Sequence, residues 1–192
     1  VGNNTITFNA LPDNTYNNCT IRVTDNASNT SSPLSVTQFI IDTTAPTVEE
    51  ETAVTTPGND TTPRYTFSSN EAGTISYGGS CSSSTTSAVA GNNTITFNAL
   101  ADGTYNNCKI SVTDDNNSNT SDNLSVNTFT IDITTPTLSS VTIASNNSVS
   151  TLAKTGDNIT LSITSAEAIQ TPSVSISGQA AAVSGDDNIT WS

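Results

Sequence analysis

Apolar side chains alternate with threonine and serine along much of this chain. The alternation is clearest between residues 47 and 136, in three pairs of apolar residues two positions apart: Ile95 and Phe97, Ile110 and Val112, and Leu124 and Val126. A period of two is typical of a β-strand with one buried face. Segments rich in Gly, Asn and Asp divide this stretch into about seven short strands. The sequence therefore predicts an all-β fold built from Greek-key β-sandwiches.

The last predicted strand changes parity partway along its length. From Leu124 the apolar residues fall on even positions, but Phe129 and Ile131 fall on odd ones. The same change occurs between Leu34 and Phe39. One extra residue in a strand shifts the side chains that follow to the other face, so we predict a β-bulge here.

A long internal repeat organises the sequence. The ten residues that start at Gly2 recur unchanged from Gly91, an offset of 89, and 20 of the 24 positions in residues 2–25 are identical to their counterparts. After one inserted residue the match continues at an offset of 90 as far as Pro136. A unit of about 90 residues has the size of a small domain, whereas solenoid repeats are much shorter. We therefore predict consecutive domains.

The offset also predicts where each domain begins. Residues 1–46 are the C-terminal half of one domain, residues 47–136 are a complete domain, and residues 137–192 are the N-terminal part of a third. We call these segments repeat 1, repeat 2 and repeat 3. On this interpretation both ends lie inside domains, and we expect the sequence to be a window from a longer tandem array.

Composition excludes several functions. Seventeen acidic residues against four basic ones give a net charge of −13, which would repel nucleic acid and anionic membranes, so we expect neither as a partner. No apolar run is long enough to cross a bilayer. The absence of histidine removes the commonest general base and the usual zinc ligand. We therefore expect no catalysis, and acidic pairs in turns and linkers are weak grounds for a glycosidase.

Several motifs resemble a known family. Asp102-Gly-Thr-Tyr leads into Cys108-Lys-Ile-Ser-Val-Thr-Asp, and Asp42-Thr-Thr-Ala-Pro marks a domain boundary. These motifs are similar to the bacterial Ig-like repeats of large secreted and surface proteins. Repeat 3, with Leu152-Ala-Lys-Thr-Gly-Asp-Asn-Ile-Thr-Leu and Trp191, resembles a subtype without cysteine. The resemblance implies tandem Ig-like sandwiches and an extracellular or cell-surface location, but it indicates little about ligands.

The three cysteines follow the repeat. Cys19 and Cys108 occupy the same position in successive repeats, so Cys81 is the remaining half of a pair. We predict a disulfide between Cys81 and Cys108, with Cys19 bonded to a cysteine outside this chain. A buried free thiol is the alternative. A disulfide implies an oxidising compartment.

Two other groups of residues are candidates for a specific role. Tyr105 lies three residues before Cys108, one residue further than the corner tyrosine of antibody domains, and a half-buried strand tyrosine is the alternative interpretation. Carboxylates at the domain boundaries and before the last strand could bind Ca²⁺, which prefers hard oxygen ligands. The candidates are Asp25, Asp42, Asp114, Asp115 and Asp132. Ordinary solvated turn aspartates are the alternative, and no other cofactor is expected.

The function predicted from these observations is structural. We expect a segment of an extracellular stalk, adhesin or filament, whose partners are neighbouring repeats and other copies in a fibre. The alternatives are a module that recognises glycans or proteins and a spacer in a secreted hydrolase. Carbohydrate binding usually needs aromatic platforms, and repeat 2 offers only Tyr65, Tyr77 and Tyr105.

Overall fold

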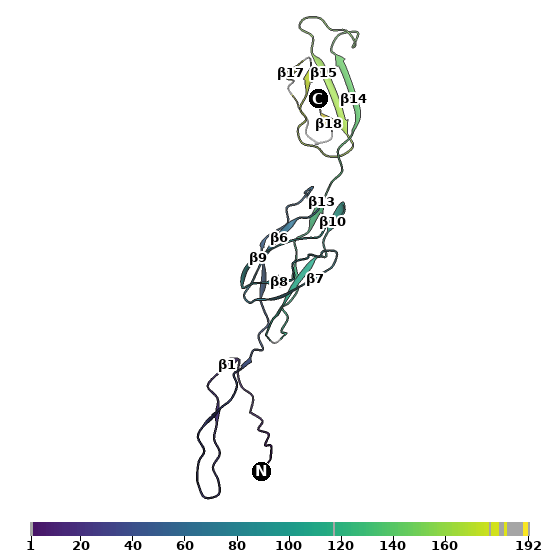
Figure 1. The fold of residues 1–192 in the computed structure, drawn as a ribbon. Coiled ribbons are helices and arrows are strands. Elements are labelled where there is room, and N and C mark those ends of the chain that lie inside the picture. Colours follow the sequence, from purple (N-terminus) through teal and green to yellow (C-terminus); the bar gives the residue numbers. More distant parts are fainter. Residues whose placement is uncertain (1, 117, 177, 181–182, 184–189, 192) are drawn as a thin grey trace. The chain divides into compact units, whose positions relative to one another are not determined.

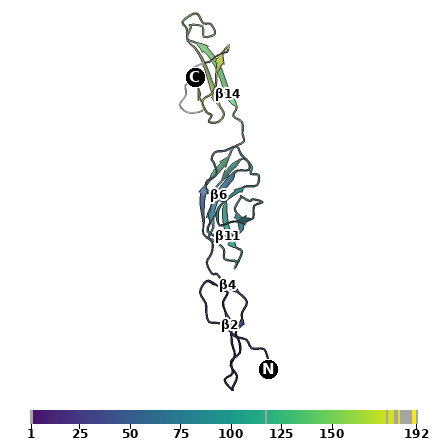
Figure 2. The same cartoon turned by 60° about the vertical axis from the view of Figure 1, so that its left-hand side comes forward.

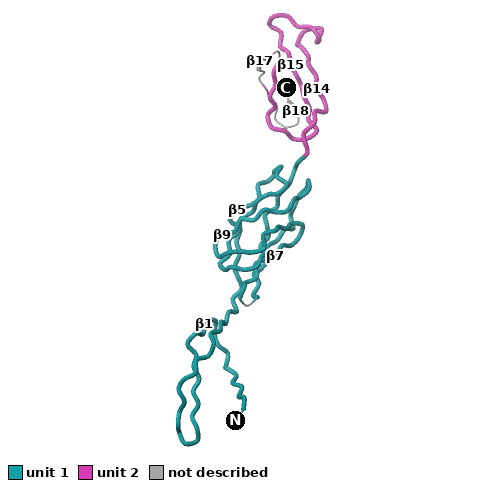
Figure 3. The backbone as a smooth tube through the Cα atoms, viewed as in Figure 1, with its two compact units in different colours: residues 1–133 teal, residues 134–192 magenta. Residues whose placement is uncertain are grey.

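The computed structural model describes residues 2–116, 118–176, 178–180, 183 and 190–191. All secondary structure in these residues is β, so the all-β prediction is confirmed. The chain divides into two compact units, Val1–Ile133 and Thr134–Ser192, which Figure 3 colours separately. Within the described residues we find no helix that could span a membrane.

Repeat 2 forms a complete β-sandwich in the first unit (Figure 1). The described residues of repeat 2 form more strands than the sequence pattern predicts, because several of the predicted strands are broken into short pieces. Nine strands result: β5 (Val48–Thr52), β6 (Arg64–Ser69), β7 (Gly73–Gly78), β8 (Ser87–Ala88), β9 (Gly91–Thr96), β10 (Gly103–Tyr105), β11 (Lys109–Asp114), β12 (Leu124–Ser125) and β13 (Phe129–Ile131).

The core of repeat 2 lies between two antiparallel sheets. One sheet has the order β5-β6-β9 and the other β12-β11-β7-β8, while β10 pairs with β13. Figure 2 shows β6 and β11, which belong to different sheets. Every second residue of β6 and of β11 is buried, as a half-buried strand requires. The largest fully buried side chains are Tyr65, Phe67, Phe97, Phe129, Ile95, Ile110, Ile131 and Val112.

The predicted bulge in the last strand is wrong. Leu124 lies in β12, which pairs with β11, whereas Phe129 and Ile131 lie in β13, which pairs with β10. Residues 126–128 between them belong to no strand. The chain thus leaves one sheet and enters another, and this crossing changes the parity that faces the core.

Repeat 1 reproduces two strand pairs from the second half of repeat 2. Its β1 (Asn14–Tyr16) pairs with β4 (Phe39–Ile41) in the register of β10 with β13. Likewise β2 (Thr20–Ile21) pairs with β3 (Leu34–Ser35) in the register of β11 with β12. The ten residues from Gly2 form no strand, although the identical ten from Gly91 include β9. Because β9 pairs with β6, and no described strand pairs with residues 2–11, the two identical segments differ in structure.

The second unit begins in the same way as repeat 2. Its main sheet has the order β14 (Leu138–Ser145), β15 (Ile159–Ser165) and β18 (Thr190–Trp191), and β16 (Ser175–Ile176) pairs with β17 (Gln179–Ala180). The Ser165 hydroxyl donates to the Glu167 carbonyl, as the Ser69 hydroxyl does to the Glu71 carbonyl. The sheet order and this turn match the β5-β6-β9 sheet of repeat 2.

Two tyrosines of repeat 2 should respond oppositely to loss of the hydroxyl. The buried Tyr65 hydroxyl makes no hydrogen bond of normal length among the described residues, and burial, then the charge and the side-chain contact of nearby Glu50, raises its pKa. Tyr65→Phe should therefore raise the free energy of unfolding by about 1 kcal/mol. Tyr105→Phe, the matched control, loses a 2.9 Å hydrogen bond to the Ala101 carbonyl and should lower it by about 1 kcal/mol. Denaturant titration measures both free energies of unfolding. Destabilisation by Tyr65→Phe would contradict the conclusion that the Tyr65 hydroxyl is buried without a good hydrogen bond.

Candidate functional site

A disulfide joins Cys81 to Cys108, the pair predicted from the repeat. Both cysteines are buried, and their Cα atoms are 5.2 Å apart, within the usual range for a disulfide. The bond links the segment after β7 to the residue before β11. Cys19, at the position of Cys108 in repeat 1, is free and partly exposed.

The turn before Cys81 requires a glycine. Gly79 has a φ of +74°, which residues with a Cβ rarely adopt, and a Cβ there would lie 2.0 Å from the Asn107 carbonyl oxygen. The Asn107 side chain accepts a 3.1 Å hydrogen bond from the Ser80 N–H. These close contacts place the chain carrying Cys81 directly beside the residue that precedes Cys108.

The geometry of Tyr105 fits the corner-tyrosine interpretation. Its hydroxyl donates to the carbonyl of Ala101, four residues upstream, and its ring stacks on Phe129 at 5.3 Å. Tyr16 in repeat 1 donates to the carbonyl of Pro12 in the same way, also at 2.9 Å. A tyrosine bonded to the backbone a few residues upstream is a hallmark of Ig-like sandwiches.

Asp114 and Asp25 each organise the loop that follows them. Asp114 is buried, and its carboxylate accepts N–H bonds from Asn116, Ser118 and Asn119. Asp25 accepts equivalent bonds from residues 27 and 29. Such bonds are typical of aspartates in turns, where they replace part of the backbone hydrogen bonding. These hydrogen bonds support the interpretation of Asp25 and Asp114 as turn aspartates.

The structure brings together only part of the predicted calcium set. The carboxylates of Asp42 and Asp114 lie with that of Glu71, and one oxygen from each is within 4.8 Å of the others. Sequence reasoning missed Glu71, because nothing in the sequence relates the turn after β6 to these aspartates. Asp42 is also held through its carbonyl, which accepts a 3.2 Å bond from the Asn119 side chain.

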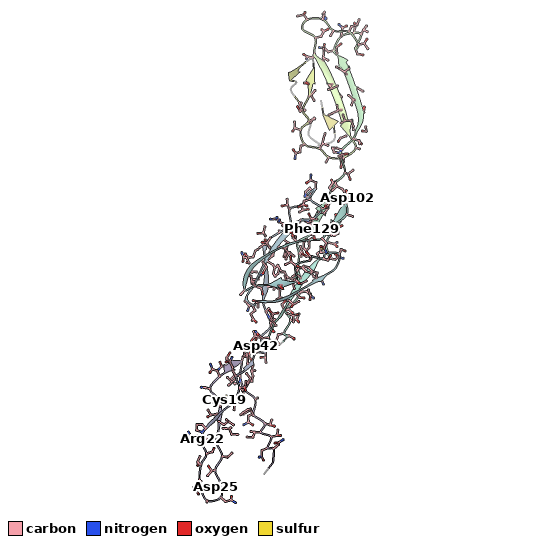
Figure 4. All side chains as sticks on the ribbon, in the orientation of Figure 1. Cys19, Arg22, Asp25, Asp42, Asp102 and Phe129 are labelled. Atoms are coloured by element: carbon pink, nitrogen blue, oxygen red, sulfur yellow. A yellow bond between two sulfur atoms is a disulfide. The ribbon has the colours of Figure 1, made fainter. Side chains whose placement is uncertain are left out.

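The other predicted ligands are not part of this cluster in the described residues. Figure 4 labels Asp25 in the hairpin loop of repeat 1 and Asp42 close to repeat 2. Asp115 is exposed next to the cluster residue Asp114, and exposed Asp132 donates its backbone N–H to the Gly58 carbonyl at 2.9 Å. Ca²⁺ binding thus stays a prediction, narrowed to the three clustered carboxylates.

Calcium should stabilise the first unit if these carboxylates share an ion. Two Ca²⁺–oxygen bonds of about 2.3–2.6 Å can span oxygens about 5 Å apart, so the cluster has a suitable size. We expect millimolar Ca²⁺ to raise the melting midpoint and a chelator to reverse the rise, because the ion would bind only the folded state. Glu71→Gln should weaken the response, whereas Glu49→Gln, outside the cluster, should not. If calorimetry finds the same melting midpoint with and without Ca²⁺, the prediction of a calcium site is wrong.

Three aspartates should titrate below their ordinary range. Hydrogen bonds to the ionised carboxyl lower the pKa of Asp13 (from Thr43), of Asp25 (from Asn29) and of Asp157 (mainly from the Lys154 N–H). A lowered pKa means that these bonds stabilise the folded state at neutral pH and are lost as the pH falls through the lowered value. Carboxyl ¹³C NMR should find all three below 3.8, the ordinary value. Midpoints at or above that value would contradict the hydrogen bonding.

The fold and its details define the chain as an Ig-like β-sandwich protein. Residues 91–192 match the family model for the bacterial Ig-like domain (group 3). This match covers more than half of the chain, and the chain belongs to that family. No curated protein and no solved structure matches it. Domains of this family are typically structural or adhesive modules without catalytic activity, and they are often extracellular.

Proposed function

We propose that this chain is a non-catalytic segment of a long extracellular stalk or filament built from tandem Ig-like repeats. The observation that carries the proposal is that the β1-β4 and β2-β3 pairs of repeat 1 have the register of the β10-β13 and β11-β12 pairs of repeat 2, at the spacing of the sequence repeat. A chain that repeats one sandwich gains length with each unit and no new chemistry. Neighbouring repeats, and other copies in a fibre, are the partners that such a role requires.

Several features of repeat 2 suit an extended extracellular protein. The Cys81–Cys108 disulfide limits unfolding and favours an oxidising compartment. Pro46 and Pro136 flank the repeat, and proline fixes φ and removes a backbone donor, so strands do not continue across these positions. The net charge of −13 keeps successive repeats from associating non-specifically.

The tyrosines of repeat 2 argue against the glycan-binding alternative. Tyr65 is fully buried, and Tyr77 and Tyr105 are partly buried. The Tyr77 hydroxyl donates to the Thr85 carbonyl at 2.6 Å and that of Tyr105 donates to the Ala101 carbonyl. Sugar-binding sites stack rings against exposed aromatic faces, and these three rings serve the sandwich itself.

Electron microscopy of the full-length natural protein tests the proposal. We expect rows of regularly spaced domains, with many copies of the repeat per molecule. An isolated compact monomer would overturn the stalk, and binding of the purified chain on a glycan array would favour the recognition module. A catalytic domain in the flanking sequence would favour the spacer of a secreted hydrolase.

A further inference from the structure

Two segments of repeat 2 run side by side in the same direction. Residues 54–58, the entry segment, follow β5, the first strand of the repeat, and residues 127–132, the exit segment, contain β13, the last strand. Gly58 and Ile131 form a parallel bridge between them. The strand pairs of the described residues are all antiparallel, so this contact differs in kind from the rest of the sandwich.

The side chain of Asn127 joins the two segments at their first contact. Its Oδ1 accepts a 2.9 Å hydrogen bond from the Val54 N–H, and its Nδ2 donates a 3.0 Å bond to the Val54 carbonyl. An amide side chain offers both an acceptor and donors, so it can satisfy both backbone groups of one residue. Asn127 therefore does for Val54 what a neighbouring strand does elsewhere.

Three more hydrogen bonds follow along the two segments. The Thr130 N–H donates to the Thr56 hydroxyl oxygen at 2.9 Å. The Gly58 N–H donates to the Thr130 carbonyl at 3.0 Å, and the Asp132 N–H donates to the Gly58 carbonyl at 2.9 Å. Val54 and Ile131 are both buried in the core beside these bonds, and a less polar environment strengthens a hydrogen bond.

The parallel course of the segments decides how tension would act on these five bonds. In a stalk under tension, the preceding repeat pulls the entry segment towards its N-terminal end, and the following repeat pulls the exit segment towards its C-terminal end. Two parallel segments are then pulled in opposite directions along a common axis. All five bonds are loaded together, and the chain between Gly58 and Asn127 carries no tension until they break.

We propose that these five hydrogen bonds form a clamp that carries the tension through repeat 2, with the Asn127 side chain as its link to Val54. The inference rests on the proposed function, because a repeat carries tension only where the array connects distant points. It deepens that function by giving the stalk a load-bearing contact in named residues.

Single-molecule force spectroscopy of the 192-residue chain, held by its two ends at constant force, tests the clamp. The disulfide identifies the unfolding step of repeat 2, because reduction frees 27 residues and should lengthen that step by about 90 Å. Asn127→Ala removes two of the five bonds and should make repeat 2 unfold at least about tenfold faster at the same force. An unchanged rate would overturn the proposal.

Asn93→Ala is the matched control. The Asn93 side chain accepts a 2.8 Å bond from the Val89 N–H and donates 2.9 Å bonds to the Val89 and Gly91 carbonyls, so it also bridges backbone groups. Its turn lies in the part of the chain that the clamp protects from tension. Both variants should lose similar stability in a denaturant titration, but only Asn127→Ala should unfold faster under force. Equal acceleration would show that overall stability sets the rate, and would overturn the clamp.

A change of pulling direction tests the clamp without altering its residues. Asn59 is exposed and follows the entry segment directly. With one handle at residue 59 and the other at the C-terminus, both segments are pulled from their C-terminal ends, and the bonds open one after another. Repeat 2 should then unfold at least about tenfold faster at the same force than when held by its two ends. Equal rates in the two directions would overturn the proposal, even if Asn127→Ala fails to fold.

Failure of the clamp and failure of the proposed function give different results. Rows of domains in micrographs of the natural protein, together with no effect of Asn127→Ala or of pulling direction, would overturn the clamp and leave the stalk. A compact natural monomer whose repeat 2 still unfolds faster with Asn127→Ala, and not with Asn93→Ala, would overturn the stalk and support the clamp.

Discussion

Phe97→Ala should lower the free energy of unfolding of repeat 2 by about 3–5 kcal/mol, whereas Phe8→Ala should lower that of repeat 1 by less than about 1 kcal/mol. Phe97 is 1% exposed and stacks between Tyr65 and Phe129, so its removal leaves a cavity in a closed core. Phe8 is 60% exposed, and water already contacts most of its ring. Guanidinium titration followed by circular dichroism, with a domain-resolved probe such as NMR, measures both.

Each variant is the control for the other. The two phenylalanines occupy the same place in an identical ten-residue sequence, so strand propensity and the unfolded chain contribute almost equally to both substitutions. The difference between the two changes in unfolding free energy therefore measures the effect of burial. Similar costs for the two variants would mean that residues 2–11 are packed much as β9 is, and would contradict the exposed face of repeat 1.

The same pair of segments shows what the sequence can predict. Alternation correctly indicates a strand at β9, where Ile95, like Phe97 just after the strand, is buried in the core. It indicates a strand equally well at residues 2–11, where the structure has none. Strand propensity measures fit to a half-buried pleated surface, and β6 supplies that surface in one repeat only. Periodicity predicts which residues face a core, but not whether a partner strand is present.

The parity change before Phe129 is a second limit of sequence reasoning. A bulge and a crossing between sheets both shift the buried side chains by one position, so the pattern is the same for the two structures. The pairing partners decide between them. Because β12 pairs with β11 and β13 pairs with β10, the structure contains a crossing. Pairing partners are distant in the sequence, and one sequence does not report them.

The candidate site, too, could be predicted from the sequence only in part. The Cys81–Cys108 pair could be predicted because the repeat identifies Cys19 with Cys108 and leaves Cys81 as the partner. The carboxylate cluster could be predicted only in part. The positions of Asp42 and Asp114 at a boundary and a loop make them candidates, but Glu71 joins them through the folding of the turn after β6. A single sequence carries no signal for that contact.

Removing the disulfide should lower the free energy of unfolding of repeat 2 by about 3.5 kcal/mol. The bond closes a loop with a sequence separation of 27 residues, and on the chain-entropy model a loop of this length restricts the unfolded chain by that amount. The variant Cys81→Ser with Cys108→Ser removes both thiols together, and Cys19→Ser, which breaks no bond within the chain, is the control and should leave the midpoint unchanged.

Guanidinium titration distinguishes this mechanism from a loss of packing. If the disulfide acts on the unfolded chain, its removal lets that chain expand and expose more surface, so the slope of the free energy against denaturant should increase as the midpoint falls. Both cysteines are buried, so the serines also carry a polar cost that mild reduction of the native protein does not. Reduction should therefore shift the midpoint slightly less than the double variant. An unchanged midpoint after complete reduction would show that strand pairing alone stabilises the sandwich and that the proposed role of the disulfide in the stalk is wrong.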